Sequence, residues 1–163
     1  MASWQFTCIV VPRKTWELNH PNPVTQAFES SLSWWEGMTL AQMIALLAPL
    51  GPPAADHWDK TAIVWGHASS TIVAIHPTED SLVDEVRLRV DLRGATPHFV
   101  HALMAIMTTH GWIFISEHGD EVSPDAEHLE HAAQASDAGL FVNNPEAYLQ
   151  KVQQRAERDG HDE

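Results

Sequence analysis

The segment EHLEH, residues 127–131, contains the side chains best suited to metal chemistry. Glu127, His128, Glu130 and His131 follow one another on a predicted helix. Zinc sites on helices place two imidazoles four residues apart, with a glutamate beside the bound water. These histidines are three residues apart, which still allows one helix face, but the sequence fixes no third ligand. A metal site at His128 and His131 is therefore an alternative interpretation, and the main expectation is a protein without cofactors.

Motifs for other kinds of catalysis are missing from the sequence. It contains no G-x-S-x-G nucleophile turn, no glycine-rich phosphate loop, no pair of cysteines and no H-E-x-x-H. A metal-dependent enzyme using the His/Glu cluster stays open. The sequence nevertheless favours a protein that is not an enzyme.

Carboxylates dominate a predicted hairpin and the helix that follows it. No Lys or Arg occurs between Arg93 and Lys151. A dense field of one charge steers partners of the opposite charge during association. We therefore predict a surface that binds a basic protein, the alternative being an acidic surface that only keeps the protein soluble. The predicted partner-binding carboxylates are Glu117, Asp120, Glu121, Asp125, Glu127 and Glu130.

Three arginines alternate with apolar residues in the stretch EVRLRVDLRG, residues 85–94. This period of two predicts a strand with one face on the core and the other facing solvent or another molecule. Arg87, Arg89 and Arg93 either pair with carboxylates on neighbouring strands or take part in recognition, for which arginine is well suited. We include these arginines among the candidate partner-binding residues.

Two consecutive tryptophans, Trp34 and Trp35, form a second candidate binding feature. Neighbouring residues in regular structure point in different directions, so we expect one ring in the core and the other at least partly exposed. Exposed tryptophans often anchor interfaces. The pair therefore suits a hetero-partner or a homodimer, and an oligomeric accessory protein is a further alternative. Packing around irregular loops is the simpler interpretation.

Composition limits the classes of protein that fit. The chain has 163 residues, 44% of them hydrophobic, and a net charge of −13. This length suits one globular domain, and this charge repels nucleic acid and anionic membranes. The N-terminal apolar run is shorter than a membrane span requires. The single cysteine, Cys8, cannot form an internal disulfide, which favours a reducing, cytoplasmic location, and its apolar surroundings in the sequence predict that it is buried.

The order of predicted elements indicates an α+β fold. We expect a mixed sheet of about five strands with helices packed mainly on one face, in a single domain spanning 1–163 with a short disordered tail from about 157. Strand, helix and strand over residues 85–116 predict a βαβ-like unit. Strands are predicted at 4–11, 60–66, 70–76, 85–93 and 112–116, and helices at 24–32, from Thr39, from Pro97, from Ser123 and from Asn144.

A family resemblance follows from these features together. A small acidic α+β chain without a catalytic motif, with tryptophans and a carboxylate-rich face, resembles the immunity proteins that bacteria make against polymorphic or secretion-delivered toxins. The segment SDAGLFVNNPEAYLQ also looks like a recurrent ending of uncharacterised bacterial single-domain proteins. The resemblance implies a stoichiometric inhibitor that binds a basic toxin in the bacterial cytoplasm. It assigns no role to any individual residue.

Overall fold

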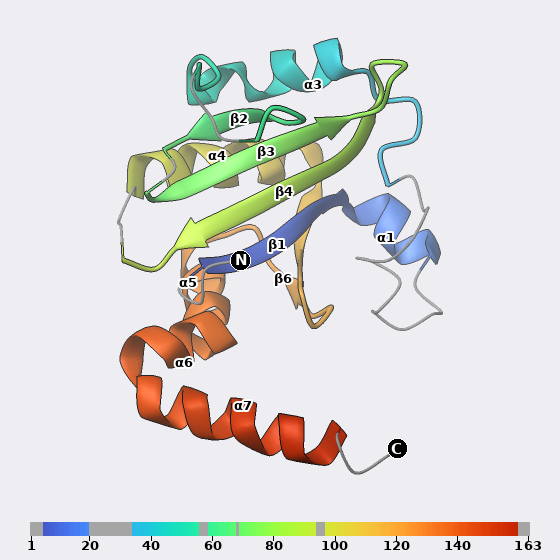
Figure 1. Cartoon of the computed structure of the whole chain (residues 1–163). Coiled ribbons are helices and arrows are strands. Elements are labelled where there is room, and N and C mark those ends of the chain that lie inside the picture. The colour runs from blue at the N-terminus through green and yellow to red at the C-terminus, as the bar shows by residue number, and fades with distance from the viewer. Residues whose placement is uncertain (1–4, 20–33, 56–58, 68, 94–96, 160–163) are drawn as a thin grey trace.

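The computed structural model describes residues 5–19, 34–55, 59–67, 69–93 and 97–159, which form an α+β fold (Figure 1). A six-stranded sheet is combined with helices in this part of the chain. The elements are β1 Gln5–Pro12, α1 Arg13–Asn19, α3 Leu40–Leu47, the 3-10 helix η1 Ala48–Leu50, β2 Ile63–Gly66, β3 Thr71–Pro77, β4 Val83–Asp91, α4 Pro97–His110, β5 Trp112–Ser116, β6 Glu121–Val122, α5 Ala126–Ala135, α6 Asp137–Asn143 and α7 Pro145–Asp159.

The sheet is antiparallel throughout, in the order β2-β3-β4-β1-β5-β6. The expectation of a mixed sheet is therefore wrong, and the short β6 raises the number of strands to six. Strands β4 and β5 do run in the same direction, as the βαβ-like pattern implied, because both are antiparallel to β1. They are not neighbours, however. The N-terminal strand β1 lies between them, and no local pattern in residues 85–116 reveals that insertion.

Strand β1 occupies the centre of the sheet and is buried on both faces. Cys8 pairs with Leu88 of β4 and with Ser116 of β5, and each residue from Phe6 to Val11 is buried. A strand that is covered on both sides needs a continuous apolar run rather than an alternating one. The run FTCIVV supplies it.

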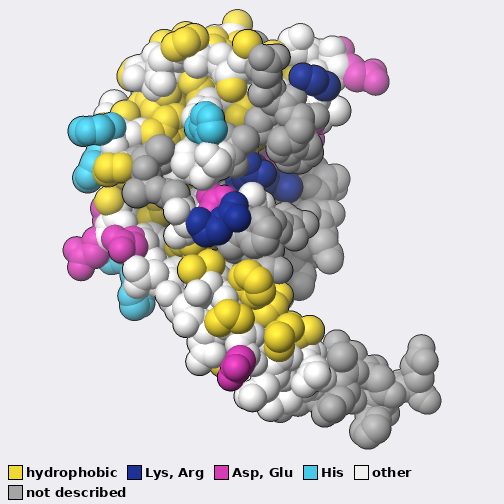
Figure 2. All heavy atoms as spheres, turned by 60° about the vertical axis from the view of Figure 1, so that its left-hand side comes forward, with side chains coloured by type: hydrophobic (Ala, Val, Ile, Leu, Met, Phe, Trp, Pro, Cys, Tyr) yellow, Lys and Arg dark blue, Asp and Glu magenta, His cyan; other side chains and the backbone are white. Residues whose placement is uncertain are grey.

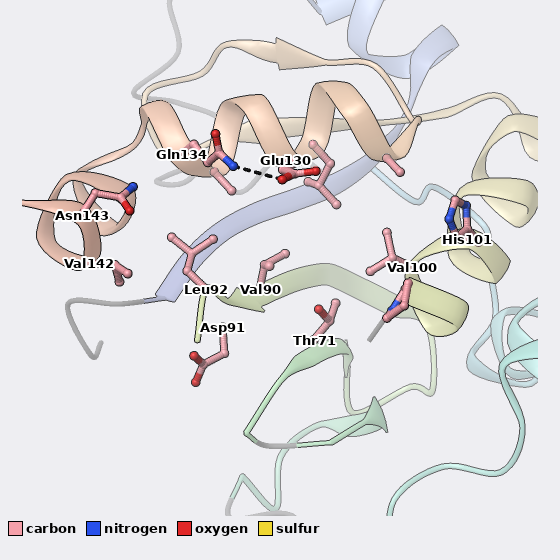
Figure 3. Close-up of a pocket in the computed structure, with 14 residues that line it drawn as sticks. Thr71, Val90, Asp91, Leu92, Val100, His101, Glu130, Gln134, Val142 and Asn143 are labelled. Carbon is pink, nitrogen blue, oxygen red and sulfur yellow. Dashed lines mark hydrogen bonds between the residues drawn. The ribbon is translucent and has the colours of Figure 1, made fainter. Parts of the chain in front are cut away.

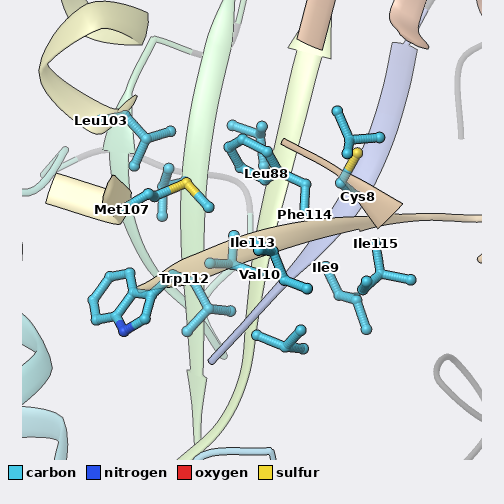
Figure 4. Close-up of a cluster of buried hydrophobic side chains, with 14 of the residues drawn as sticks. Cys8, Ile9, Val10, Leu88, Leu103, Met107, Trp112, Ile113, Phe114 and Ile115 are labelled. Atoms are coloured by element: carbon cyan, nitrogen blue, oxygen red, sulfur yellow. The ribbon is translucent and has the colours of Figure 1, made fainter. Parts of the chain in front are cut away.

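Helices α4 and α5 lie together behind the sheet in Figure 1. Figure 4 shows Leu103 and Met107 of α4 beside Leu88 and Phe114 of the sheet, and all four side chains are at most 1% exposed. One continuous core thus joins the strands to these helices. This packing agrees with the expected helix layer on one face.

Both consecutive tryptophans belong to the core, so the expectation that one of them is exposed is wrong. Trp34 is 7% and Trp35 is 2% exposed. Trp35 packs edge-on against Trp112 with ring centroids 5.0 Å apart, and Trp34 lies 5.7 Å from Trp16. The pair escapes the expected alternation because these residues form turns rather than a regular helix or strand. Neither ring is available at the surface as an anchor.

Two of the predicted helix starts agree with the structure, and the start of α5 does not. Thr39 Oγ1 accepts from the backbone N–H of Gln42 at 3.2 Å, while Gln42 Oε1 accepts from the N–H of Thr39 at 2.9 Å. Helix α7 begins at Pro145, as predicted, and Asn144 Oδ1 accepts from the N–H of Ala147 at 3.1 Å. Helix α5 starts later than expected, because Asp125 rather than Ser123 is its N-cap.

Several predicted helices differ from those in the structure. The helix predicted at 24–32 lies outside the described residues, whereas α1 and α6 were not predicted. Helix α7 continues to Asp159, past the point where we expected the tail to begin. Within the described ranges, no helix combines the length and the apolar character needed to cross a membrane.

Candidate partner-binding site

A hollow of about 270 Å³ lies between the β5–β6 hairpin and helix α5. The hairpin supplies its carboxylates, and hairpin and helix together supply its imidazoles. Among the described residues that line it there is no Lys or Arg. The ionisable residues at its wall are Glu117, His118, Asp120, Glu121, His128 and His131. We call this feature the hairpin hollow.

A tight turn positions the hairpin carboxylates. The Ser116 hydroxyl accepts from the backbone N–H of Asp120 at 3.1 Å, and the Ser116 N–H donates to the carbonyl of Asp120 at 2.9 Å. Gly119, between them, has a φ of +78°, a conformation that glycine adopts without strain. The turn leaves Glu117 and Asp120 exposed at the rim of the hollow.

A basic residue far away in the sequence partly neutralises this rim. Arg13, at the start of α1, forms a 2.6 Å ion pair with Glu121. The pairing arises because β1 lies beside β5, which brings the residue after β1 next to the hairpin. Sequence reasoning missed Arg13, since it considered only the charges between residues 94 and 150. Glu117 and Asp120 therefore carry most of the unneutralised charge of the hairpin.

Asp125 has a structural task at the start of α5. Its carboxylate accepts from the backbone N–H of His128 at 2.9 Å and lies 2.6 Å from the Nδ1 atom of the same residue. These two hydrogen bonds, the backbone one first, hold the pKa of Asp125 below its ordinary value. Glu127 is exposed in the first helical turn, where a negative charge interacts favourably with the helix dipole. Asp125 is thus a poor candidate for partner contact, whereas Glu127 remains available.

Glu130 faces a different region. It lines a larger cleft of about 430 Å³ between α4, α5, α6 and the adjoining ends of β3 and β4 (Figure 3). There it accepts a 3.0 Å hydrogen bond from Gln134. Helix α5 therefore separates two hollows. The six predicted carboxylates do not form a single surface, because Glu130 lies on the cleft side of α5 and the hairpin residues lie on the other.

The structure brings three histidines to the hairpin hollow, His118 in addition to the predicted His128 and His131. His118 was not singled out, because a lone histidine in a turn carries no spacing signal. Across the described part of the chain, no three His, Cys, Asp or Glu side chains are grouped closely enough to hold a metal ion. The hollow therefore offers carboxylates and imidazoles as separate hydrogen-bonding groups.

Two arginines of the row pair with carboxylates two residues before them in the chain. Arg87 bonds Glu85 at 2.7 Å, and Arg93 bonds Asp91 at 2.7 Å. Arg87 and Arg89 are less exposed than expected: both are half-buried, and their neighbours on β3, Ala74 and Ile72, are 8% and 4% exposed, whereas Arg93 is exposed. Burial lowers the pKa of Arg89, with Asp91 acting in the opposite direction. Arg87 and Arg89 therefore belong to a partly buried charged seam rather than an open binding face, and Arg93 lies at the exposed end of that seam.

Asp91 is the buried centre of that seam, although the alternating pattern placed it on the wet face. It is 1% exposed and accepts from the backbone N–H and Nε of Arg93, both at 3.0 Å. The hydrogen bonds from the Arg93 side chain, opposed by burial, hold the pKa of Asp91 below its ordinary value. A carboxylate with a depressed pKa stabilises the fold above its unfolded pKa and loses that effect as pH falls through the folded one.

Replacing Asp91 with asparagine is expected to lower the free energy of unfolding at pH 7 by about 2 kcal/mol, since hydrogen bonds to charged groups contribute about 1.5–3 kcal/mol. The difference from wild type should shrink once pH falls below about 3.9, where the unfolded carboxyl takes up a proton. Urea unfolding between pH 2.5 and 7 measures both effects. Asp84→Asn, exposed on the same strand, is the control and should have little effect. A difference that stays constant with pH would contradict this role of Asp91.

Two features of the candidate site could be predicted from the sequence, and two could not. The hairpin and the charge of its carboxylates follow from the local sequence, whereas the Arg13 pair and the convergence of three histidines depend on the order of strands in the sheet. Comparison with known proteins adds nothing to these features: the chain matches no protein-family model, and no curated protein or solved structure is detectably similar to it.

Proposed function

We propose that this chain is a stoichiometric protein-binding inhibitor, an immunity protein that neutralises a basic bacterial toxin in the cytoplasm. The observation that supports the proposal best is the rim of the hairpin hollow. Glu117 and Asp120 are exposed there, and no described Lys or Arg lines the hollow beneath them. A cationic side chain of a partner would meet the carboxylates of Glu117 and Asp120, whereas Glu121 is already paired with Arg13.

The size of the hollow fits this mode of binding. A water molecule occupies about 30 Å³ of liquid, so a hollow of about 270 Å³ has room for the end of a basic side chain together with ordered water. Arg is the partner side chain best suited to the hollow, because its planar guanidinium binds carboxylates with two parallel hydrogen bonds. The hollow would then act as a socket, and the exposed carboxylates around it would steer the approach.

The hairpin is also held in place, which lowers the entropic cost of binding. Ser116 fixes the turn from inside, and the Arg13 pair with Glu121 ties β6 to the start of α1. On the other side of the hollow, Asp125 fixes the first turn of α5. A partner would therefore meet a surface whose shape is set before the encounter.

Co-expression with the protein encoded beside it in the genome tests the proposal. We expect a one-to-one complex that survives purification, together with protection of the host cell from the toxicity of that protein. Glu117→Lys combined with Asp120→Lys should weaken both effects, while the folded structure is checked by circular dichroism. If every neighbouring gene product is harmless and none binds, the proposal of an immunity protein is wrong.

A further inference from the structure

Helix α7 leaves much of its apolar surface uncovered. It projects from the body in Figure 1, and its main packing partner is α6. Leu149 is 57% and Val152 is 42% exposed, and Val142 of α6 beside them is 39% exposed. Figure 2 shows apolar side chains gathered where this arm joins the body. A continuous apolar patch of this kind marks an interaction surface more often than scattered exposed residues do.

The spacing of these residues explains the patch. Tyr148, Leu149 and Val152 fall on one side of α7, because residues three and four apart share a helix face. Tyr148 packs edge-on against Phe141 of α6 with ring centroids 5.3 Å apart. Leu149 and Val152 continue the same stripe beyond α6. Helix α7 is thus amphipathic, with an apolar stripe wider than its contact with α6 requires.

The 430 Å³ cleft lies next to this patch and complements it. Val142 lines the cleft, is 39% exposed, and belongs to α6, the helix against which α7 packs. Figure 3 shows Val90 of β4 and Leu92, just after this strand, pointing toward α5, while the Asp91 carboxylate points to the other side. Apolar side chains therefore form much of the cleft wall, and Glu130 adds a carboxylate at its side.

We propose that the chain forms a two-fold dimer in which α7 of each copy places Leu149 and Val152 in the 430 Å³ cleft of the other. A two-fold interface needs one self-complementary patch that supplies both the inserted group and the receiving one. Helix α6 packs against α7 and contributes the exposed Val142 to the cleft wall, so the α7 stripe and the cleft together supply such a patch. Reciprocal docking covers both features at once, and the assembly closes after two copies.

Charge favours a second copy as the occupant. Helix α7 contains three basic and three acidic residues within a chain of net charge −13, and its Lys151, Arg155 and Arg158 are the only basic residues after Arg93. The arm is therefore the part of the C-terminal half least repelled by another acidic body. Lys151 is already paired with Asp137 of α6, so the zero net charge of the helix, rather than a free cation, favours its contact with an acidic copy. The cleft thus receives the segment of this chain that combines apolar and basic residues.

Light scattering after size-exclusion chromatography measures the assembly. The full chain should elute with twice the 18.2 kDa mass of one copy at concentrations near 100 µM. Leu149→Glu with Val152→Glu should reduce it to a single copy with an unchanged circular dichroism spectrum, because both side chains are exposed. Leu18→Glu is the matched control, since Leu18 is 73% exposed on α1 and should leave the dimer intact. A monomeric wild type, or a dimer that survives the double variant, overturns the proposal.

Cysteine pairing distinguishes arm-to-cleft docking from arm-to-arm docking. Cys8 is buried, and burial raises the pKa of its thiol, so it should not interfere. In a mixture of Gln134→Cys and Val152→Cys, mild oxidation should give mainly disulfides between one variant and the other. Pairing of Val152→Cys with itself would place two arms against each other and overturn the proposed geometry.

The proposal of a dimer and the proposal of inhibition can be contradicted independently of each other. The hairpin hollow and the cleft lie on opposite sides of α5, and they share none of their lining residues. A monomeric chain that still binds a basic toxin would reject the dimer alone. A dimer with no toxin partner would reject the inhibition alone. If the isolated chain is monomeric and a different protein binds in the cleft, the dimer is also contradicted.

Discussion

Exchanging Glu117, Asp120 and Glu127 for lysine is expected to slow association with the basic partner recovered by co-expression by about 10- to 1,000-fold at low salt. These three carboxylates are exposed, and none of them caps a helix or pairs with a described Lys or Arg. Asp125 and Glu121 stay unchanged, because their replacement would remove the α5 cap and the Arg13 ion pair. Stopped-flow mixing measures the association rate, and the effect should diminish in high salt, because screening acts over about 10 Å at 0.1 M.

A matched variant separates local steering from net charge. Glu79 and Asp80 are exposed in the turn between β3 and β4, and Asp84 is exposed at the start of β4. The register of the sheet places this turn at the opposite end of the strands from the hairpin. Their triple exchange for lysine changes the net charge by the same amount, yet it should slow association far less. Equal slowing by both variants would show that the hairpin surface has no special role.

Replacing Gly66 with alanine is expected to lower the free energy of unfolding by about 3 kcal/mol, which combines backbone strain and overpacking. Gly66 ends β2 with a φ of +95°, and an added Cβ would lie 2.2 Å from the carbonyl oxygen of Thr71. That oxygen belongs to the backbone of β3, so it cannot move aside without disturbing the edge of the sheet. Guanidinium unfolding measures the loss.

Gly51 provides the control for the steric part of this effect. Its φ is +93°, nearly that of Gly66, but an added Cβ would meet nothing within 4 Å. Gly51→Ala should therefore cost about 1 kcal/mol, from the strained backbone alone. If both variants lose the same stability, the close approach of Thr71 has no energetic consequence, and the packing at the end of β2 is looser than described.

Local chemistry made several elements predictable. The capping pair of Thr39 and Gln42, the Asn144-Pro145 start of α7 and the strand WIFIS all depend on residues within a few positions of one another. Gly111, with a φ of +65°, separates α4 from β5 where the sequence placed the break. Short-range patterns of this kind are visible without knowing the fold.

The order and direction of strands lay beyond such patterns. Nothing local to residues 85–116 shows that β1 separates β4 from β5, and this insertion turns the expected mixed sheet into an antiparallel one. Asp91 was placed on a wet face because alternation gives only the side of a strand, not what covers that side. The buried tryptophan pair was misjudged for the same reason.

The candidate site was likewise only partly predictable from local sequence. Glu117 and Asp120 project from the predicted hairpin, which their own turn determines. The position of Glu130 on the far side of α5 depends on how that helix rotates against the sheet, and that rotation is set by the burial of Leu129 and Ala133. Assigning all six carboxylates to one surface required this tertiary information.

The central place of β1 also governs when the molecule can fold. Cys8 pairs with Leu88 and Ser116, so β1 can take its place only after both flanking strands, which follow it in the chain, have been synthesised. Contacts so distant in sequence slow folding, because a long loop must close before they form. Until then the run FTCIVV stays unpaired on the nascent chain, where an exposed apolar strand promotes aggregation. A chaperone that holds this segment during translation would therefore raise the yield of folded protein more than one that acts on the helical C-terminal part.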